Sequence, residues 1–267
     1  MRWVVQTNLG KEYVDQLREA CKVHDYEFIP EIAIPFSHKV PSIDAESPVI
    51  FYGATNWINK IWLHNESNIL QGKAWRPGVF FNPESIFPMW NGKYGKHSLN
   101  NGAWLTTFYR ASVDKRLNDD EDKLWFVRPA SDMKEFAGMV ISGREIREWE
   151  KSMTGDVAAL GHTAIILNEP YAIRSEWRLF IVNGKVSTGS QYRTNHRFNQ
   201  SPDVPQDVVD FAEARTKEYA PSHVFVMDIG YTGGRLYVIE IGCFNSAGFY
   251  AADVNKLVKD VSEAGNG

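Results

Sequence analysis

The feature that most constrains this chain is a pair of strand-like segments, residues 226–230 and 237–241, joined by a short glycine-containing segment. Each carries one acid, Asp228 in the first and Glu240 in the second. A turn centred on Gly234 would place the two acids opposite each other on one face of an antiparallel pair, with Cβ atoms about 4.5–5.5 Å apart. Two carboxylates at that range repel unless a cation lies between them, and hard oxygen ligands suit Mg²⁺. The spacing favours a divalent-metal site, with a salt bridge or an exposed strand pair as the alternative.

Length, cysteine content and charge limit the class of protein. The chain has 267 residues, 43% of them hydrophobic, which is enough for one large or two smaller domains. Its two cysteines, Cys21 and Cys243, are too few for a disulfide framework and indicate a reducing compartment. No run approaches the roughly 20 apolar residues of a membrane span. We expect a cytoplasmic protein without a membrane partner, and the net charge of −4 does not demand nucleic acid.

The hydrophobic periodicity changes along the chain. Residues 2–66 alternate strand and helix patterns, whereas residues 76–105 show little regular period and read as aromatic loops. The polar run 114–123 is a candidate domain edge, and beyond it the pattern is rich in antiparallel strands flanked by helices. We therefore predict an α+β fold, with an α/β N-terminal domain at residues 1–112 and a second domain at residues 113–267. The strands predicted in the second domain are 124–128, 139–142, 163–168, 177–182, 185–192, 223–229 and 235–241, and its helices are 144–151, 205–218 and 252–264.

Two further segments carry charges suited to an anionic ligand. Arg128 ends a strand and Lys134 lies in the following loop, an arrangement that could clamp a polyphosphate. Two surface cations beside an ordinary hairpin are the alternative. Glu176 and Arg178 share a strand face by their period of two, and a cross-strand ion pair explains that pattern equally well. Asn245, shortly after the second acid, could add a neutral oxygen ligand.

In their order and spacing, these elements resemble the ATP-grasp superfamily of carboxylate–amine ligases over about residues 120–262. Within the superfamily the chain is similar to a clade found in phages and bacteria, in which Arg takes the place of the usual phosphate-binding strand Lys. The segment 245–250 is also similar to that clade. The common pattern has an Asn two residues after the metal-binding Glu. Gly242 stands there in this sequence, and Asn245 is the nearest replacement.

The resemblance implies an ATP-grasp fold that clasps ATP between two α+β subdomains, with ATP and Mg²⁺ as cofactors. It implies a ligase that forms an acylphosphate and then an amide. The implied metal ligands are Asp228, Glu240 and Asn245; the nucleotide-binding residues are Arg128, Lys134, Leu167, Glu169 and Glu176; Arg178 and Arg193 face the γ-phosphate and the acylphosphate.

The implied substrates are a carboxylate and an amine, carried by small molecules, peptides or proteins. Two other functions remain open at this stage. A nucleic-acid-acting protein could use the aromatic and basic cluster at residues 192–198 to stack bases and hold phosphates. A non-catalytic domain that keeps only an ATP-grasp shape is the other, and Gly242 is the residue that favours it.

Overall fold

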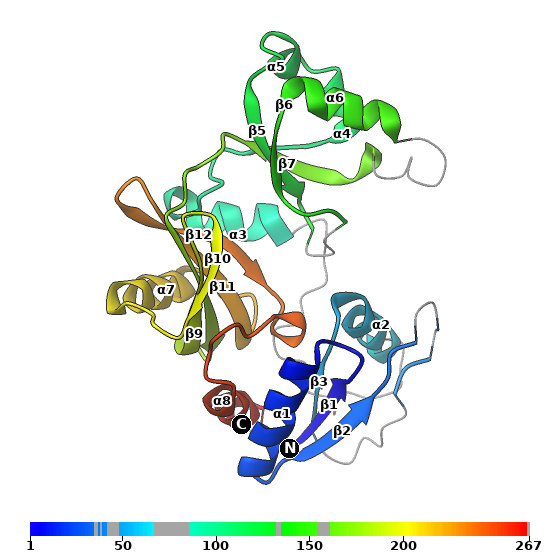
Figure 1. Cartoon of the computed structure of the whole chain (residues 1–267), viewed down its shortest axis with the longest axis vertical. Coiled ribbons are helices and arrows are strands. Elements are labelled where there is room, and N and C mark those ends of the chain that lie inside the picture. The colour runs from blue at the N-terminus through cyan, green and yellow to red at the C-terminus, as the bar shows by residue number, and fades with distance from the viewer. Residues whose placement is uncertain are drawn as a thin grey trace. The chain divides into compact units, whose positions relative to one another are not determined.

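The computed structural model describes residues 1–34, 37, 39–41, 48–66, 86–131, 135–153 and 161–265. It divides into two compact units, drawn together in Figure 1. The first unit joins the two ends of the chain, Met1–Phe80 and Ile173–Gly267, and the second is Phe81–Ala172. Helices account for 36% and strands for 33% of the structure, which confirms the α+β class. The domain boundary predicted at residue 112 stays a prediction.

The N-terminal part of the first unit is a parallel three-stranded sheet in the order β2-β1-β3. Parallel neighbours need a crossover connection, and α1 supplies it between β1 and β2. This helix buries Val14, Leu17 and Cys21 along one side, as its amphipathic pattern predicts. The elements are β1 (Arg2–Gln6), α1 (Lys11–Val23), β2 (Glu27–Glu31), β3 (Val49–Tyr52) and α2 (Thr55–Glu66).

The C-terminal part of the first unit is an antiparallel five-stranded sheet in the order β10-β9-β8-β11-β12. Four of the strands confirm the prediction to within a few residues. The edge strand β10 was missed, because four of its five residues are exposed and give no apolar alternation. The elements are β8 (Ser175–Val182), β9 (Lys185–Thr194), β10 (Arg197–Ser201), α7 (Gln206–Glu218), β11 (Val224–Thr232), β12 (Arg235–Gly242), the 3₁₀ helix η3 (Phe244–Ser246) and α8 (Val254–Ala264).

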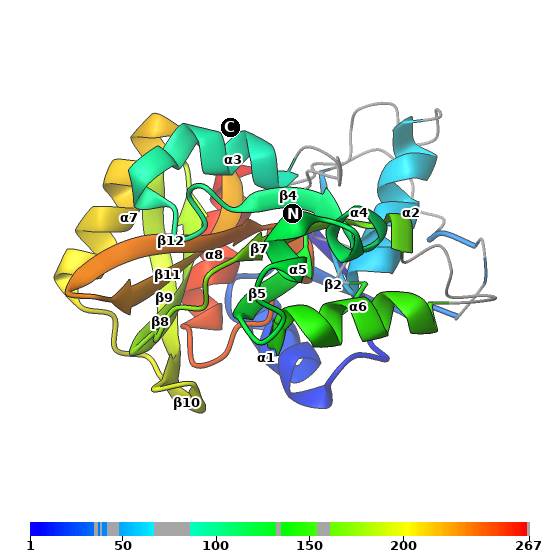
Figure 2. The same ribbon diagram turned by 90° about the horizontal axis from the view of Figure 1, so that it is seen from above.

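One hydrophobic core joins the two sheets of the first unit. It combines Trp3 of β1 and Leu17 of α1 with Phe180 of β8, Phe244 and Leu257, all fully buried. α1 and α8 pack side by side over this core (Figure 1), and the Trp3 indole donates to the Ser262 hydroxyl at 3.0 Å. α7 contacts β9, β11 and β12 but adds no side chain to the cluster, so it covers the opposite sheet face (Figure 2). The N-terminal residues are therefore structurally inseparable from the last 95.

The second unit contains an antiparallel four-stranded sheet in the order β4-β7-β5-β6. Helices α4 and α6 contribute Phe108 and Ile146 to a core under this sheet. α6 begins with a capping box, in which the Ser142 hydroxyl accepts from the Glu145 amide and the Glu145 carboxylate accepts from the Ser142 amide. The elements are α3 (Ile86–Tyr94), the 3₁₀ helix η1 (Gly95–His97), β4 (Trp104–Thr107), α4 (Phe108–Ser112), α5 (Lys115–Asn118), β5 (Leu124–Pro129), β6 (Met139–Ser142), α6 (Gly143–Ser152) and β7 (Ala164–Asn168).

The prediction of irregular aromatic loops at residues 76–105 was wrong for the described part, residues 86–105. Trp90 and Tyr94 of α3 are almost fully buried, and they pack against each other with ring centroids 6.3 Å apart. Strand β4 pairs with β7, where Leu105 lies opposite Ile166. Tertiary packing overrode a sequence rich in Gly, Asn and Pro. The rest of that stretch, residues 76–85, lies outside the described residues.

Candidate active site

Strand register brings the two predicted metal-binding acids together. Asp228 of β11 and Glu240 of β12 are directly opposed, as the spacing predicted. The turn, however, is centred between Gly233 and Gly234, since Thr232 pairs with Arg235. A regular ladder from that turn would oppose Asp228 to Ile239 and put Glu240 on the other face. A β-bulge at this point of β12 inserts one extra residue and restores the pairing of the acids.

Asp228 forms a buried bidentate ion pair with Arg178 on the next strand. Arg178 lies opposite Asp228, donating from Nε to Oδ1 at 2.9 Å and from Nη2 to Oδ2 at 2.8 Å. The two side chains are 13% and 5% exposed. Burial by itself lowers the pKa of the Arg178 guanidinium, but the charge and hydrogen bonds of Asp228 raise that pKa well above its usual value. Asp228 therefore forms the salt bridge that was the alternative to a metal site, and its partner is Arg178. Arg178, Asp228 and Glu240 lie opposite one another on three adjacent strands.

Glu176 is held by two residues of the neighbouring strand β9. The Tyr192 hydroxyl donates to Glu176 Oε2 at 2.8 Å and lies 3.5 Å from Asp228 Oδ2. Arg193 Nη1 is 3.8 Å from Glu176 Oε1, so the cross-strand ion pair considered for Glu176 also forms. A second bulge places Glu176 opposite Arg193 and Trp177 opposite Gln191, which leaves Tyr192 as the extra residue. Burial, then Asp228 and Glu176, raise the pKa of Tyr192 well above its ordinary range.

Tyr192 was singled out in the sequence only as part of the aromatic and basic cluster at residues 192–198, and not as a partner of Glu176. Its role depends on the bulge, which departs from the period of two that placed Glu176 and Arg178. Tyr250 was missed for a similar reason. Its ring stacks on Tyr192 with centroids 4.9 Å apart, and the Arg178 guanidinium lies 5.1 Å from its centre. The chain folds these residues into one connected polar and aromatic cluster.

Asn245 lies in η3, just after β12, and is tied to the N-terminal sheet. Its side-chain amide donates to the Phe51 carbonyl at 2.6 Å, its backbone carbonyl accepts from the Gly53 amide at 2.9 Å, and only 1% of its surface is exposed. The Cys243 thiol lies 3.5 Å from Asn245 Oδ1. These contacts hold the amide nitrogen on Phe51 and turn Oδ1 toward Cys243. The prediction that Asn245 replaces the usual metal-binding Asn stays a prediction.

The donor set of the Asp228–Glu240 pair fits a hard cation. Mg²⁺ in nucleotide-using enzymes is bound through one or two carboxylates plus substrate phosphates. A carboxylate offers about four lone-pair positions, and Arg178 takes two of those on Asp228. Within the described ranges there is no group of three or more His, Cys, Asp or Glu side chains that could hold a metal ion. The two carboxylates alone do not fill the coordination shell of a cation. A cation bound there would take further ligands, such as a phosphate or an amide oxygen.

The predicted nucleotide-binding residues of the second unit lie on or beside its four-stranded sheet. Arg128 of β5 is half-buried and donates from Nε to the Pro129 carbonyl at 3.2 Å. Leu167 of β7 is 1% exposed and belongs to the core, so only its backbone can contact a nucleotide. Glu169, just beyond β7, is exposed and pairs with Lys123 at 3.0 Å. Lys134 lies outside the described residues. The assigned roles of all four residues stay predictions.

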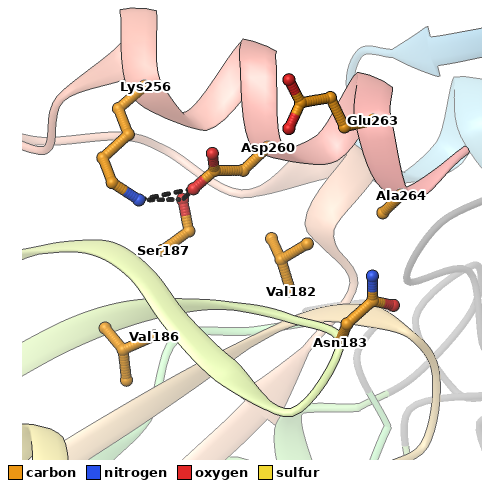
Figure 3. A pocket seen from close by; sticks show the side chains of 8 residues that line it. All are labelled: Val182, Asn183, Val186, Ser187, Lys256, Asp260, Glu263 and Ala264. Carbon is orange, nitrogen blue, oxygen red and sulfur yellow. Dashed lines mark hydrogen bonds and ion pairs between the residues drawn. The ribbon is translucent and has the colours of Figure 1, made fainter.

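A shallow pocket of about 320 Å³ lies elsewhere on the first unit, between α8 and the β8–β9 hairpin (Figure 3). Asp260 accepts a hydrogen bond from Ser187 at 2.6 Å and pairs with Lys256. Three of the lining side chains, Lys256, Asp260 and Ser187, thus satisfy one another, as Figure 3 shows. None of the predicted site residues lines this pocket.

Within the cluster at residues 192–198, the Tyr192 ring is buried against Tyr250, and Arg193 faces Glu176. His196, Arg197 and Phe198 are exposed, Phe198 at 66%. The described part of the chain also contains no helix with the length and apolar character to cross a bilayer. The comparisons below give no support to a nucleic-acid partner.

Comparisons with known proteins agree with this arrangement. The family model "ATP-grasp domain, R2K clade family 3" matches residues 35–261. Among solved structures, the chain is similar to the D-cycloserine synthetase DcsG, with a TM-score of 0.69, 12% identity and 99% of each chain covered. No curated protein sequence matches the chain.

Two peptide-modifying enzymes have the same fold. The ATP-grasp ligase PsnB, complexed with minimal precursor, Mg and ADP, aligns with a TM-score of 0.58 and 13% identity over 100% of this chain and 98% of PsnB. The macrocyclase MdnC of Microcystis aeruginosa MRC, bound with the precursor peptide MdnA, aligns with a TM-score of 0.60 and 10% identity over 98% and 99% of the two chains. Because the family model spans most of the sequence, the chain belongs to the ATP-grasp domain family of the R2K clade, family 3, and is an ATP-dependent ligase.

Proposed function

We propose that this ligase joins a carboxylate to an amine through an acylphosphate, with Mg²⁺ bound at Asp228 and Glu240. The single observation that carries the proposal is the row Glu240–Asp228–Arg178 across three adjacent strands. It sets two acids suited to a cation beside a cation suited to a phosphate. Family membership supplies ATP as the phosphoryl donor.

The proposed reaction has two steps. A substrate carboxylate oxygen attacks the γ-phosphorus of ATP, the bond from that phosphorus to the β-phosphate bridging oxygen breaks, and ADP leaves. An amine nitrogen then attacks the carbonyl carbon of the acylphosphate, phosphate leaves, and the amine loses a proton to complete the amide. Phosphoryl transfer depends mostly on positioning and charge neutralisation. Bound Mg²⁺ supplies part of that neutralisation, and Asp228, Glu240 and the Oδ1 oxygen of Asn245 would hold it.

Arg178 can hold Asp228 and still contact a phosphate. A guanidinium has five N–H groups, and Arg178 uses one on Nε and one on Nη2 for Asp228. The two Nη1 hydrogens face no hydrogen-bond partner among the described residues. In a site with little water, such a preoriented cation stabilises developing negative charge more strongly than a mobile one. We assign Arg178 to the γ-phosphate and the acylphosphate.

Arg193 and the residues of the second unit complete the proposed set. The Arg193 side chain is 51% exposed and 3.8 Å from Glu176, so it can turn toward a bound anion at little cost. Arg128 and Lys134 would neutralise the α- and β-phosphates. The Leu167 backbone would contact the adenine and Glu169 the ribose hydroxyls. Glu176 holds Tyr192 and Arg193 in place for this task.

The N-terminal residues 1–112 are proposed to shape the pocket for the carboxylate or the amine, and residues 113–267 to carry ATP. Relatives of the same fold include a small-molecule synthetase and enzymes crystallised with precursor or precursor peptide. These support either small molecules or peptides as substrates. Gly242 and the attachment of Asn245 to Phe51 are the two features that depart from the common metal-binding pattern, so the metal site is the part of the proposal that most needs a test.

The test begins with ATP-dependent thermal stabilisation. ATP with Mg²⁺ is expected to raise the melting temperature of the wild-type chain, since a ligand at 100 times its Kd stabilises by about 2.7 kcal/mol. Glu240→Gln should lose the Mg²⁺ dependence of this effect and all ATP turnover. Glu263→Gln, which changes an exposed side chain of α8, is the matched control and should behave as wild type.

ADP release is then measured across amino acids, peptides and amines. A wild-type chain that binds ATP with Mg²⁺ but releases ADP with no carboxylate and amine pair would refute the proposed carboxylate–amine reaction. Wild-type turnover in Glu240→Gln would refute the metal site. No stabilisation of the wild type at saturating ATP would end the ligase proposal itself.

A further inference from the structure

Tyr250 has a backbone conformation that tyrosine rarely adopts. Its φ angle is +54°, in the left-handed region. The other described non-glycine residues with positive φ are Asp25, Asn183, Asn195 and His196, which belong to the types that tolerate this region best. Such conformations persist only where the surrounding structure enforces them, and they cluster at functional sites. We therefore expect neighbouring contacts to enforce this conformation of Tyr250 and the conformation to serve a function.

The residues on either side of Tyr250 enforce the conformation. The Phe249 ring is fully buried and stacks on Tyr52 with centroids 5.0 Å apart. The Ala251 amide donates to the Ser190 hydroxyl at 3.1 Å, and Ser190 is the β9 residue opposite Arg178. Ser190 is in turn anchored to the Ser201 carbonyl at 3.0 Å. With both flanks fixed, the side chain of Tyr250 has one direction left.

That direction leads to the Arg178 guanidinium. The Tyr250 ring stacks on Tyr192 at an interplanar angle of 13°, and the guanidinium carbon of Arg178 lies 5.1 Å from the Tyr250 centroid and 5.8 Å from that of Tyr192. Phe198 packs edge-on against Tyr250 from the β10 side, with centroids 6.0 Å apart. A cation near aromatic faces gains electrostatic stabilisation, most when water is excluded. The Tyr250 and Tyr192 rings thus lie beside the guanidinium that Asp228 holds.

We propose that Tyr250 is a positioning residue, whose ring holds the Arg178 guanidinium on Asp228 and keeps its Nη1 hydrogens aimed at the transferred phosphate. This inference rests on the proposed function and adds to it a residue that acts through Arg178. The ring is the working part, because the Tyr250 hydroxyl has no hydrogen-bond partner among the described residues. A phenylalanine at position 250 should therefore keep Arg178 in position, whereas a leucine should not.

The first arm of the test uses the free protein and needs no activity. The Arg178 Nε–H signal, identified in a ¹H–¹⁵N spectrum by its loss in Arg178→Lys, should exchange slowly with solvent. Tyr250→Phe should preserve the chemical shift and the slow exchange. Tyr250→Leu should move the signal, because the ring current is lost, and should speed exchange at least about tenfold. Tyr26→Leu is the control. It removes a partly buried tyrosine at the edge of the core that contains Phe249, and it should change neither the chemical shift nor the exchange rate of the Arg178 Nε–H.

The second arm measures ADP release with a substrate pair found for the wild type. Tyr250→Leu should lower kcat at least about tenfold with KM for ATP within about threefold, and Tyr250→Phe should remain within about twofold of the wild type on both. If Tyr250→Leu does not fold, Ser190→Ala removes the anchor of the Ala251 amide without removing a ring. It should speed Nε–H exchange by a smaller factor.

The two arms separate the possible failures. Unchanged exchange of the Arg178 Nε–H in Tyr250→Leu overturns the proposal, as does an unchanged kcat. A Tyr250→Phe variant as impaired as Tyr250→Leu also overturns it, because the hydroxyl would then be the working group. A wild-type chain that releases no ADP refutes the proposed ligase function, and the exchange data alone then decide whether Tyr250 positions Arg178.

Discussion

A buried ion pair on the five-stranded sheet of the first unit contrasts with an exposed ion pair beside the four-stranded sheet of the second. On the first, Arg178 and Asp228 form a bidentate pair whose members are 13% and 5% exposed. On the second unit, Arg144 and Asp122 form a pair of the same chemistry and a similar length, 2.9 Å, with members 54% and 83% exposed. Burial rather than distance distinguishes them.

The contrast shows that the candidate catalytic residues of the first unit also have structural duties. Once buried, Arg178 and Asp228 depend on each other, since either one alone would be an uncompensated charge in a poor solvent. The exposed charges of the second unit can lose their partners to water. Replacing Arg178 or Asp228 therefore changes activity and stability together. In the second unit the two effects can be measured separately.

The largest effect is expected from breaking the buried pair. Asp228→Ala should lower the free energy of unfolding of the first unit by about 3–5 kcal/mol, because Arg178 is left buried without a partner. Asp122→Ala is the matched control and should cost less than about 1 kcal/mol. Urea denaturation followed by tryptophan fluorescence measures both. Equal losses would mean that the burial contrast has no energetic consequence, and that water reaches Arg178 in the free protein.

A smaller effect is expected at alkaline pH. The pKa of Tyr192 is raised in the folded chain, by burial and then by Asp228 and Glu176, above an unfolded value of about 10. Below the unfolded pKa both states keep the proton, so the stability contribution is fully present. Above about pH 10 the unfolded chain loses its proton first and stability falls, until the pH passes the folded pKa. Tyr192→Phe should flatten this alkaline decline, as measured by urea denaturation between about pH 8 and pH 11. An equally steep decline in the variant would show that another group causes it.

The smallest effect on stability is expected from the exposed pair Lys123–Glu169. Glu169→Gln should change the free energy of unfolding by less than about 1 kcal/mol. If Glu169 contacts the ribose of ATP, the same variant should weaken ATP binding about tenfold, since hydrogen bonds to charged groups contribute about 1.5–3 kcal/mol. Isothermal titration of ATP measures this, with Glu148→Gln on α6 as a control. Wild-type affinity in Glu169→Gln would remove this residue from the nucleotide site.

Sequence patterns predicted most of the fold because the strands of the first unit alternate or run apolar over five or more residues. Strands β8, β11 and β12 were predicted to within three residues at each end. Hydrophobic periodicity did not predict elements that lack an apolar period of their own. Strand β10 is largely exposed, and α3 and β4 lie in a stretch of turn-forming residues that packing makes regular. Family resemblance, rather than periodicity, led to the ATP-grasp fold.

The candidate site was predictable only as a list of residue types. Asp228, Glu240, Glu176 and Arg178 were singled out, and the structure joins Asp228 to Arg178 and brings Glu240 opposite Asp228. Their partners were not predictable, because Tyr192 reaches Glu176 from a bulge and Tyr250 reaches Arg178 through a left-handed residue. Both features break the local rules from which sequence-based reasoning works.

By itself, the sequence determined which residues could make a phosphate and metal site and on which strands they lie, because side-chain direction alternates regularly along an extended chain. Tertiary structure alone decided that Asp228 and Glu240 share a face. Their spacing of twelve residues suits a turn centred on Gly234. The observed turn is centred between Gly233 and Gly234, and the bulge in β12 restores the pairing of the two acids. A shift of one residue reverses every side chain beyond it, and pairing with the neighbouring strand decides whether that shift occurs.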